Sequence, residues 1–164
     1  MKTLIIVRHA KSSWEFPELS DDQRPLLEKG KKRTRKVINH LNKAPFDRPD
    51  LIISSHAVRA LETARIFAHA LGVRPDEIQV SKTLYHGDAE MILDQLYGIN
   101  DEIQSVMLVG HNPTLTSFAN LFLPKPIEWI PTSGVVILKI PVGEWTEVGV
   151  SKATHSQKIF PKEL

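Results

Sequence analysis

The chain has 164 residues, of which 41% are hydrophobic and 24% are charged, and its formal net charge is +2 at pH 7. This composition is ordinary for a soluble globular protein, and it excludes a collagen-like, disordered or membrane-spanning chain. The sequence holds no cysteine, which excludes a disulfide framework, a thiolate nucleophile and a thiolate zinc site. We expect one domain over residues 1–164, with a core over about 2–150 and a loosely ordered tail over 151–164.

No stretch of the sequence has the pattern of a targeting segment. The apolar run over residues 4–7 is interrupted by Arg8, so it is shorter than the ~7–15 residues of a signal-peptide core. No window approaches the ~18 apolar residues of a membrane helix. We therefore expect a cytoplasmic protein.

Short apolar runs alternate along the chain with segments of helical periodicity. In chain order we predict a strand at 4–7, a helix at 25–42, a strand at 51–53, a helix at 57–71, a strand at 78–80, a helix at 88–97, a strand at 106–109, a helix at about 115–122 and strands at 135–140 and 144–150. This alternation predicts an α/β fold with three layers, in which a mostly parallel central sheet has helices on both faces. The last two strands are predicted to form a C-terminal antiparallel hairpin.

Ionisable residues follow three of the predicted strands. Arg8 and His9 follow the first strand, Arg59 lies one turn into the helix after the second, and His111 follows the fourth. In open α/β sheets, ligands bind beyond the carboxyl ends of the strands. We therefore expect these two histidines and two arginines to meet at one edge of the sheet.

Such a cationic cluster is suited to a phosphoryl group. The planar arginine fork matches phosphate oxygens, and nearby cations oppose protonation of an imidazole. A neutral histidine between arginines is therefore a candidate nucleophile towards a bound phosphoryl group. The sequence proposes no carboxylate ligands for a metal, and we predict neither a metal nor another cofactor, because the cations would neutralise the phosphoryl charge.

Three motifs resemble the histidine phosphatase (phosphoglycerate-mutase-like) superfamily. Arg8-His9-Ala10 is similar to the Arg-His-Gly signature of that family, although alanine replaces its glycine. Residues 54–64 resemble its Ser-Ser-x-x-x-Arg-Ala-x-x-Thr-Ala motif, and residues 110–113, Gly-His-Asn-Pro, resemble its second-histidine motif. Segments 8–14 and 22–30 are particularly similar to the small SixA-type phosphohistidine phosphatases. The similarity runs from about residue 2 to residue 140.

The resemblance implies a phosphoglycerate-mutase-like fold and a role for each matching residue. His9 would attack phosphorus and carry the phosphoryl group as a covalent phosphohistidine. Arg8, Arg59 and His111 would hold the phosphoryl oxygens and stabilise charge in the transition state. Arg24, in the segment similar to the SixA branch, would line the same pocket. Water would then release phosphate and regenerate His9.

A general acid is the part of the family pattern that this sequence matches least. The candidates are Asp88 and Glu90, and Asp88 is equally suited to be a helix N-cap. An alkoxide leaving group needs a proton from such an acid, whose help is worth ~10²–10⁴-fold, whereas a protonated imidazole leaves more readily. The weak acid signal therefore favours phosphohistidine over sugar phosphates as the substrate.

The leading interpretation is a metal-independent phosphatase acting on phosphohistidine in a protein, such as a histidine phosphotransfer domain. The alternatives are a phosphatase for small phosphate esters and, from another class, a non-catalytic phosphate- or phosphoprotein-binding module. Six cations lie within residues 29–36, and we interpret them as a solvated helix face rather than a nucleic-acid site. We expect a monomer with no membrane partner. Trp14, Trp129 and Trp145 are expected to be packing anchors.

Overall fold

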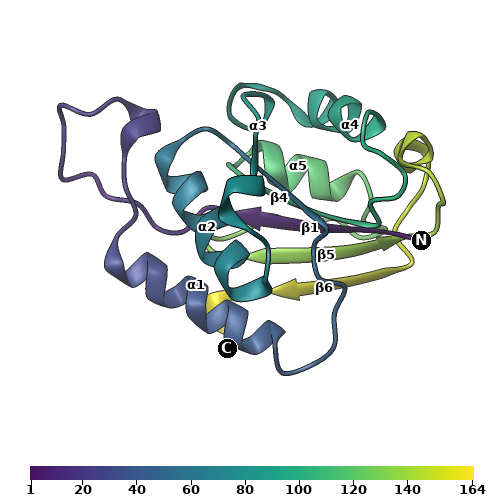
Figure 1. Ribbon diagram of the computed structural model, residues 1–164, viewed down its shortest axis with the longest axis horizontal. Coiled ribbons are helices and arrows are strands. Elements are labelled where there is room, and N and C mark those ends of the chain that lie inside the picture. Colours follow the sequence, from purple (N-terminus) through teal and green to yellow (C-terminus); the bar gives the residue numbers. More distant parts are fainter.

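The computed structural model describes all residues 1–164, and its centre is a six-stranded sheet in the order β3-β2-β4-β1-β5-β6 (Figure 1). The strands are β1 (Lys2–Arg8), β2 (Leu51–Ser54), β3 (Gln79–Val80), β4 (Ser105–Gly110), β5 (Val135–Ile140) and β6 (His155–Ile159). The α-helices are α1 (Glu28–Leu41), α2 (Val58–Leu71), α3 (Thr83–His86), α4 (Ala89–Tyr97) and α5 (Thr114–Asn120). Four short 3₁₀ segments complete the fold: η1 (Asp21–Gln23), η2 (Pro75–Glu77), η3 (Trp145–Val150) and η4 (Pro161–Glu163).

The predicted fold class is confirmed. Strands β3, β2, β4 and β1 run parallel, and β5 and β6 add two antiparallel strands beyond β1. The middle of β1, residues 4–7, has no exposed surface, because this strand lies between β4 and β5 and is covered on both faces. A continuous apolar run is the pattern that such a doubly buried strand requires.

Helices cover the sheet in two layers (Figure 1). On one face α1 and α2 bury side chains such as Val37 and Phe67 against Ile5 and Val109. On the other face α4 and α5 bury a second cluster that includes Phe118. Successive residues of β1 and β4 therefore alternate between the two clusters, and the carboxyl ends of the strands are left free at one edge of the sheet.

The prediction for the C-terminal region is wrong in its choice of segment. The segment predicted as a strand at 144–150 instead contains the 3₁₀ segment η3 (Trp145–Val150), because Trp145 and Val148, three residues apart, are both buried against the α4 side of the protein. The partner of β5 is instead β6, which lies in the tail that we expected to be loosely ordered. Only Ile159 of β6 is buried, so this edge strand carries no apolar alternation and is held mainly by backbone hydrogen bonds.

Two further differences concern the segment before α1 and the helices themselves. Helix α1 begins at Glu28 rather than residue 25, because residues 9–27 form a long loop that projects from the body of the fold (Figure 1). A single bridge between Ser12 and Leu26 closes this loop at its base. The one-turn helix α3 was not predicted. None of the helices combines the length and the apolar character that crossing a membrane requires.

Candidate active site

Strand register brings the predicted histidines together. In the parallel pair β1–β4, Arg8 lies opposite Gly110, so His9 and His111 both lie one residue beyond the paired ends. Ser54 at the end of β2 lies opposite Val109, which places Ser55 beside them. The ring centroids of His9 and His111 are 5.1 Å apart.

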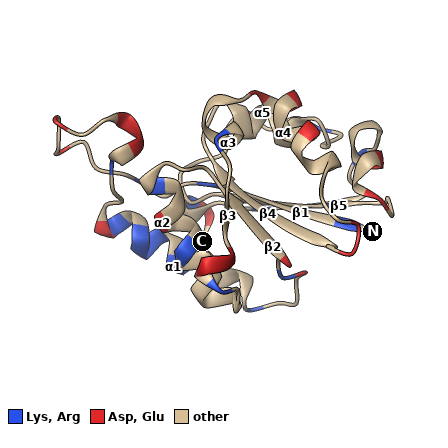
Figure 2. Cartoon of the chain, turned by 45° about the horizontal axis from the view of Figure 1, so that its top comes forward, with Lys and Arg blue, Asp and Glu red and all other residues tan.

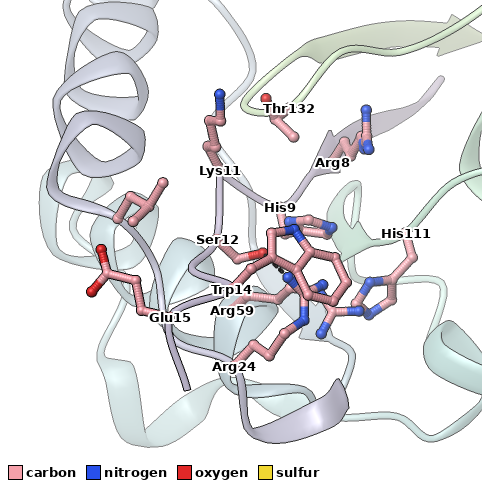
Figure 3. Close-up of a pocket in the computed structure, with 11 residues that line it drawn as sticks. Arg8, His9, Lys11, Ser12, Trp14, Glu15, Arg24, Arg59, His111 and Thr132 are labelled. Carbon is pink, nitrogen blue, oxygen red and sulfur yellow. Dashed lines mark hydrogen bonds between the residues drawn. The ribbon is translucent and has the colours of Figure 1, made fainter. Parts of the chain in front are cut away.

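These residues open into a pocket of about 690 Å³ (Figure 3). Its lining residues are Arg8, His9, Lys11, Ser12, Trp14, Glu15, Arg24, Leu27, Arg59, His111 and Thr132. The structure thus gathers all five residues that the sequence placed in the phosphoryl pocket. The lining holds four cationic side chains and a single carboxylate.

The backbone determines the tautomer of His9. Its Nδ1 lies 2.7 Å from the carbonyl oxygen of Ala10. A carbonyl only accepts, so Nδ1 carries the hydrogen and Nε2 keeps its lone pair. Burial, assisted by the charges of Arg59, Arg8 and Arg24, lowers the pKa of His9 from 6.5 to about 4, although the hydrogen bond to Ala10 acts to raise it. The ring is therefore neutral at pH 7 and has the form of a nucleophile.

A serine orients His111. His111 Nε2 lies 2.8 Å from the Ser55 hydroxyl oxygen, and that oxygen also accepts a hydrogen bond from the backbone N–H of Ala57. When the Ser55 hydroxyl donates to Nε2, the hydrogen of the neutral ring lies on Nδ1. Burial, followed by the nearby His9 and Arg59, lowers the pKa of His111 to about 3, so this ring is also neutral at pH 7.

Three of the pocket's side chains hold unused hydrogen-bonding capacity. Four buried side-chain nitrogens have no hydrogen-bond partner within the protein, and three of them are Arg8 Nε, Arg59 Nε and His111 Nδ1. A buried polar group without a partner is unfavourable by ~1–3 kcal/mol, so native proteins leave few of them. All three belong to residues that line the pocket, so they are candidate donors to an oxyanion bound there.

Asp21 is the functional candidate that the sequence reasoning missed. Its backbone carbonyl and its carboxylate accept hydrogen bonds from Arg59 Nη1 and Nη2 at 2.6 and 2.9 Å. Arg24 Nε lies 3.3 Å from the other carboxylate oxygen, and the Tyr85 hydroxyl donates at 2.6 Å. Burial acts to raise the pKa of Asp21, but the hydrogen bonds from Tyr85 and Arg59 and the charge of Arg24 outweigh it and lower that pKa to about 2. Asp21 therefore stays ionised and compensates two pocket arginines.

Two tryptophans contact arginines of the pocket, and one of them, Trp14, also lines it, contrary to the expectation that they are packing anchors. Trp14 is 77% exposed, and the Arg24 guanidinium carbon lies 3.5 Å from the centroid of its ring. Trp129 is 52% exposed and lies 5.5 Å from the guanidinium carbon of Arg8. Only Trp145 is buried in the core as expected. The exposed rings instead hold two pocket arginines by cation–π contact.

The candidate general acids lie outside the pocket lining. Asp88 is exposed and caps α4, because its carboxylate accepts a hydrogen bond from the Met91 backbone N–H at 2.9 Å. Glu90 is also exposed, in the first turn of α4. Glu15 is the carboxylate that lines the pocket, and Figure 3 shows it at the margin, with its oxygens well away from the His9 ring. The structure thus positions neither of these candidate acids, nor Glu15, beside the His9 ring.

Comparison with known proteins agrees with this geometry. An uncharacterised protein of Mycobacterium leprae is 26% identical over 159 residues, which cover 90% of this chain and 94% of that protein. The solved structure of the protein histidine phosphatase SixA with tungstate matches with a TM-score of 0.78 at 20% identity, over 98% of both chains. A candidate phosphohistidine phosphatase SixA from Agrobacterium tumefaciens matches with a TM-score of 0.73 at 27% identity, over 95% of this chain and 97% of that chain.

The fold is shared with phosphatases that act on other substrates. A mycobacterial glucosyl-3-phosphoglycerate phosphatase, solved with vanadate, matches with a TM-score of 0.67 at 15% identity, over 96% of this chain and 97% of that chain. The family model described as the histidine phosphatase superfamily (branch 1) matches residues 4–95, more than half of the sequence. The chain therefore belongs to the histidine phosphatase superfamily, branch 1, and its class of activity is that of a phosphatase.

Proposed function

We propose that this protein removes the phosphoryl group from phosphohistidine on a protein, without a metal ion, through a covalent intermediate on His9. The observation that carries the proposal is that His9, with a free Nε2 lone pair, lines the same pocket as three residues whose buried nitrogens have no hydrogen-bond partner. Arg8, Arg59 and His111 would each donate a hydrogen bond to one phosphoryl oxygen. In other phosphoryl-transfer sites Mg²⁺ neutralises the negative charge of the phosphoryl group, and here the arginines would do so.

In the first step His9 Nε2 forms a bond to phosphorus while the bond from phosphorus to the substrate nitrogen breaks. The His9 ring then becomes an imidazolium whose Nδ1–H points at the Ala10 carbonyl, 2.7 Å away. A charged donor makes a shorter and stronger hydrogen bond than a neutral one, so this contact strengthens as the intermediate forms. The Ala10 carbonyl thus stabilises the product of the attack more than the resting enzyme.

The leaving group explains why phosphohistidine suits a pocket without a general acid. A phosphorylated imidazole that carries a proton on its other nitrogen departs as neutral imidazole and needs no proton at the breaking bond. The leaving group of an alkyl phosphate is an alkoxide, which does need a proton at the breaking bond. Asp21, the carboxylate bound to the pocket arginines, is held ionised with a pKa of about 2, so it offers no proton near neutral pH.

In the second step water attacks phosphorus and the bond to His9 Nε2 breaks. The water oxygen becomes the fourth oxygen of inorganic phosphate, one water proton is released, and His9 returns to its neutral Nδ1–H form. The same three donors hold the phosphoryl oxygens in both steps, so the site needs no rearrangement between them.

Phosphate release tests the proposal directly. Wild type and His9→Ala are compared at neutral pH, with EDTA present, on a histidine-phosphorylated protein and on a panel of small phosphate esters. We expect rapid release from phosphohistidine by the wild type, no release by His9→Ala, and an acid-labile, base-stable phosphoryl group trapped on the wild-type enzyme. The His9→Ala variant should still bind tungstate through the unchanged arginines.

Other outcomes would assign other functions. Release mainly from esters would make the protein a small-molecule phosphatase, like the glucosyl-3-phosphoglycerate phosphatase that shares its fold. Binding of phosphohistidine protein without release from any substrate would indicate a phosphoprotein-binding module. Full activity of His9→Ala would refute the assignment of the nucleophile.

A further inference from the structure

A stripe of cations runs along the exposed face of α1 beside the pocket. Lys29, Arg33 and Lys36 are spaced by four and three residues, so they lie on one side of the helix, and all three are exposed. Figure 2 shows the basic segments gathered on α1. Together with Lys11 and Lys162 these residues are called the basic stripe.

The basic stripe is continuous with the catalytic pocket. Lys11 lines that pocket, and its proximity to Lys29, and less strongly to Arg33, lowers the pKa of the Lys11 ammonium. A neighbouring hollow of about 290 Å³ is lined by Arg33, Lys36 and Lys162 together with Thr132, which also lines the catalytic pocket. The cations therefore extend without interruption from the pocket along α1.

The start of α1 is held firmly against the residues that follow the nucleophile. The backbone N–H of Leu27 donates to the Lys11 carbonyl at 2.9 Å. Gly30 lies so close to this loop that a Cβ atom there would be 2.5 Å from the same carbonyl oxygen. One turn further on, the Thr34 hydroxyl is 2.9 Å from the hydroxyl of Ser133. The basic stripe thus has a fixed position relative to the pocket.

The five cations of the stripe form no ion pair within the protein. No carboxylate lies within 4.0 Å of any of its five cations, whereas Lys31, elsewhere on α1, has Glu28 at 3.1 Å and Glu62 at 4.0 Å. Cations held side by side without counter-charges repel one another, and this repulsion is relieved when an anionic partner binds. The arrangement differs from a solvated face of mixed charge, on which cations alternate with carboxylates.

We propose that the basic stripe is the docking surface for an acidic patch on the phosphoprotein whose phosphohistidine occupies the pocket. This inference rests on the proposed function and adds the recognition of the partner. From Lys29 to Lys36 the helix rises by ~10 Å, a distance that a folded protein can span with its own carboxylates while its phosphohistidine reaches His9. A small phosphate ester held in the pocket could not reach the far end of the stripe.

The test compares a large and a small substrate on the same variants. The large substrate is an acidic histidine phosphotransfer domain carrying phosphohistidine, and the small one is the free amino acid phosphohistidine. The charge-reversed variant carries both Arg33→Glu and Lys36→Glu. The neutralised variant carries both Arg33→Gln and Lys36→Gln, which remove the charges without adding carboxylates. The matched control is Lys43→Glu, an exposed lysine beyond the far end of α1 that makes no ion pair.

We expect charge reversal to lower kcat/KM for the acidic domain by about tenfold or more, because steering by complementary charge changes association rates by 10–10³. The neutralised variant should show a smaller loss, and Lys43→Glu should match wild type. For free phosphohistidine all variants should stay within about twofold of wild type. Raising the salt from about 0.01 M to about 1 M shortens the Debye length from about 30 Å to about 3 Å, so wild type should lose its preference for the acidic domain.

Three results would overturn the proposal. An unchanged kcat/KM for the acidic domain in the charge-reversed variant would leave the stripe a solvated face. An equal loss on both substrates would show that the stripe acts on the pocket rather than on docking. If a labelled RNA or DNA binds the stripe and the acidic domain does not displace it, the surface is a nucleic-acid site instead.

A binding measurement separates this proposal from the proposed function. The dissociation constant of the phosphorylated acidic domain is measured by calorimetry on the His9→Ala background, with and without Arg33→Glu and Lys36→Glu. If wild type hydrolyses neither substrate, the proposed function fails. A tenfold larger dissociation constant for the acidic domain in the charge-reversed protein would still support docking. An equal dissociation constant in the two proteins refutes docking, whatever the activity.

Discussion

Lowering the pH from 7 towards 4 should leave His9 neutral over most of that range. Burial and the surrounding arginines lower its pKa from 6.5 to about 4. At pH 5 a histidine with a pKa of about 4 is about 90% neutral, whereas one with an ordinary pKa of about 6.5 is about 3% neutral. Neutral His9, the form that the proposed mechanism requires, should therefore be about 30-fold more abundant at pH 5 than the neutral form of an ordinary histidine would be.

The titration can be measured directly by nuclear magnetic resonance on protein with labelled histidines. The His9 signal is assigned by its loss in His9→Ala, and the same chain in concentrated urea supplies the unfolded reference. The rate on an acid-stable aryl phosphate, corrected for the ionisation of the substrate, should follow the fraction of neutral His9. A titration midpoint near 6.5 in the folded protein would refute the inference that burial and arginines keep this ring neutral.

The same shift makes a prediction about stability. The unfolded chain binds a proton at the His9 ring below about pH 6.5, and the folded chain does so only below about pH 4. The contribution of His9 to the free energy of unfolding should therefore be greatest above pH 6.5. It should fall as the pH drops from about 6.5 to about 4. The full shift corresponds to about 3 kcal/mol, and His111, with its pKa lowered to about 3, acts in the same direction. Urea denaturation at a series of pH values measures the slope.

Three substitutions test other contacts of the site. Ser55→Ala removes the hydroxyl that orients His111, so kcat should fall by ~10-fold or more with a smaller change in KM, and Ser55→Thr should restore it. Trp14→Ala removes the ring stacked on a pocket guanidinium, and the resulting loss of ~0.5–1 kcal/mol should raise KM about two- to fivefold while kcat stays constant. Gly30→Ala would place a Cβ 2.5 Å from the Lys11 carbonyl oxygen, so urea denaturation should show a loss of ~1–3 kcal/mol. An unaltered kcat, KM or unfolding midpoint, respectively, would contradict each contact.

The elements that the sequence predicts well are those whose pattern follows from burial on the sheet. Strand β5 has the predicted bounds, 135–140, because five of its six residues are buried and apolar. Helix α2 ends where predicted, since Gly72 adopts a φ of 77° that few other residues tolerate. Strand β6 was missed for the converse reason, since four of its five residues are exposed and polar. Its position is determined by backbone pairing with β5, and backbone pairing does not require a particular pattern of side chains.

The site divides in the same way. The residues that follow strand ends could be located from the sequence, because parallel strands bring their carboxyl ends to one edge, and His9 and His111 indeed lie there. Asp21 and the stacked Trp14 lie in the 9–27 loop, which has neither helical nor alternating periodicity. Their contacts with Arg24 depend on how the loop folds back onto the pocket, and single-sequence patterns carry no information about that.

The contacts of Asp21 explain how a cluster of arginines can exist in a folded protein before any phosphate binds. Its carbonyl and carboxylate engage the two terminal nitrogens of Arg59, yet Arg59 Nε stays unpaired. In the proposed function, the internal counter-charge and the phosphoryl group would therefore use different atoms of this guanidinium. Binding a phosphoryl group need not break the ion pair, so the donors remain in place while charge develops on the oxygens. A carboxylate with this task must stay ionised, and that same requirement denies it the role of a general acid.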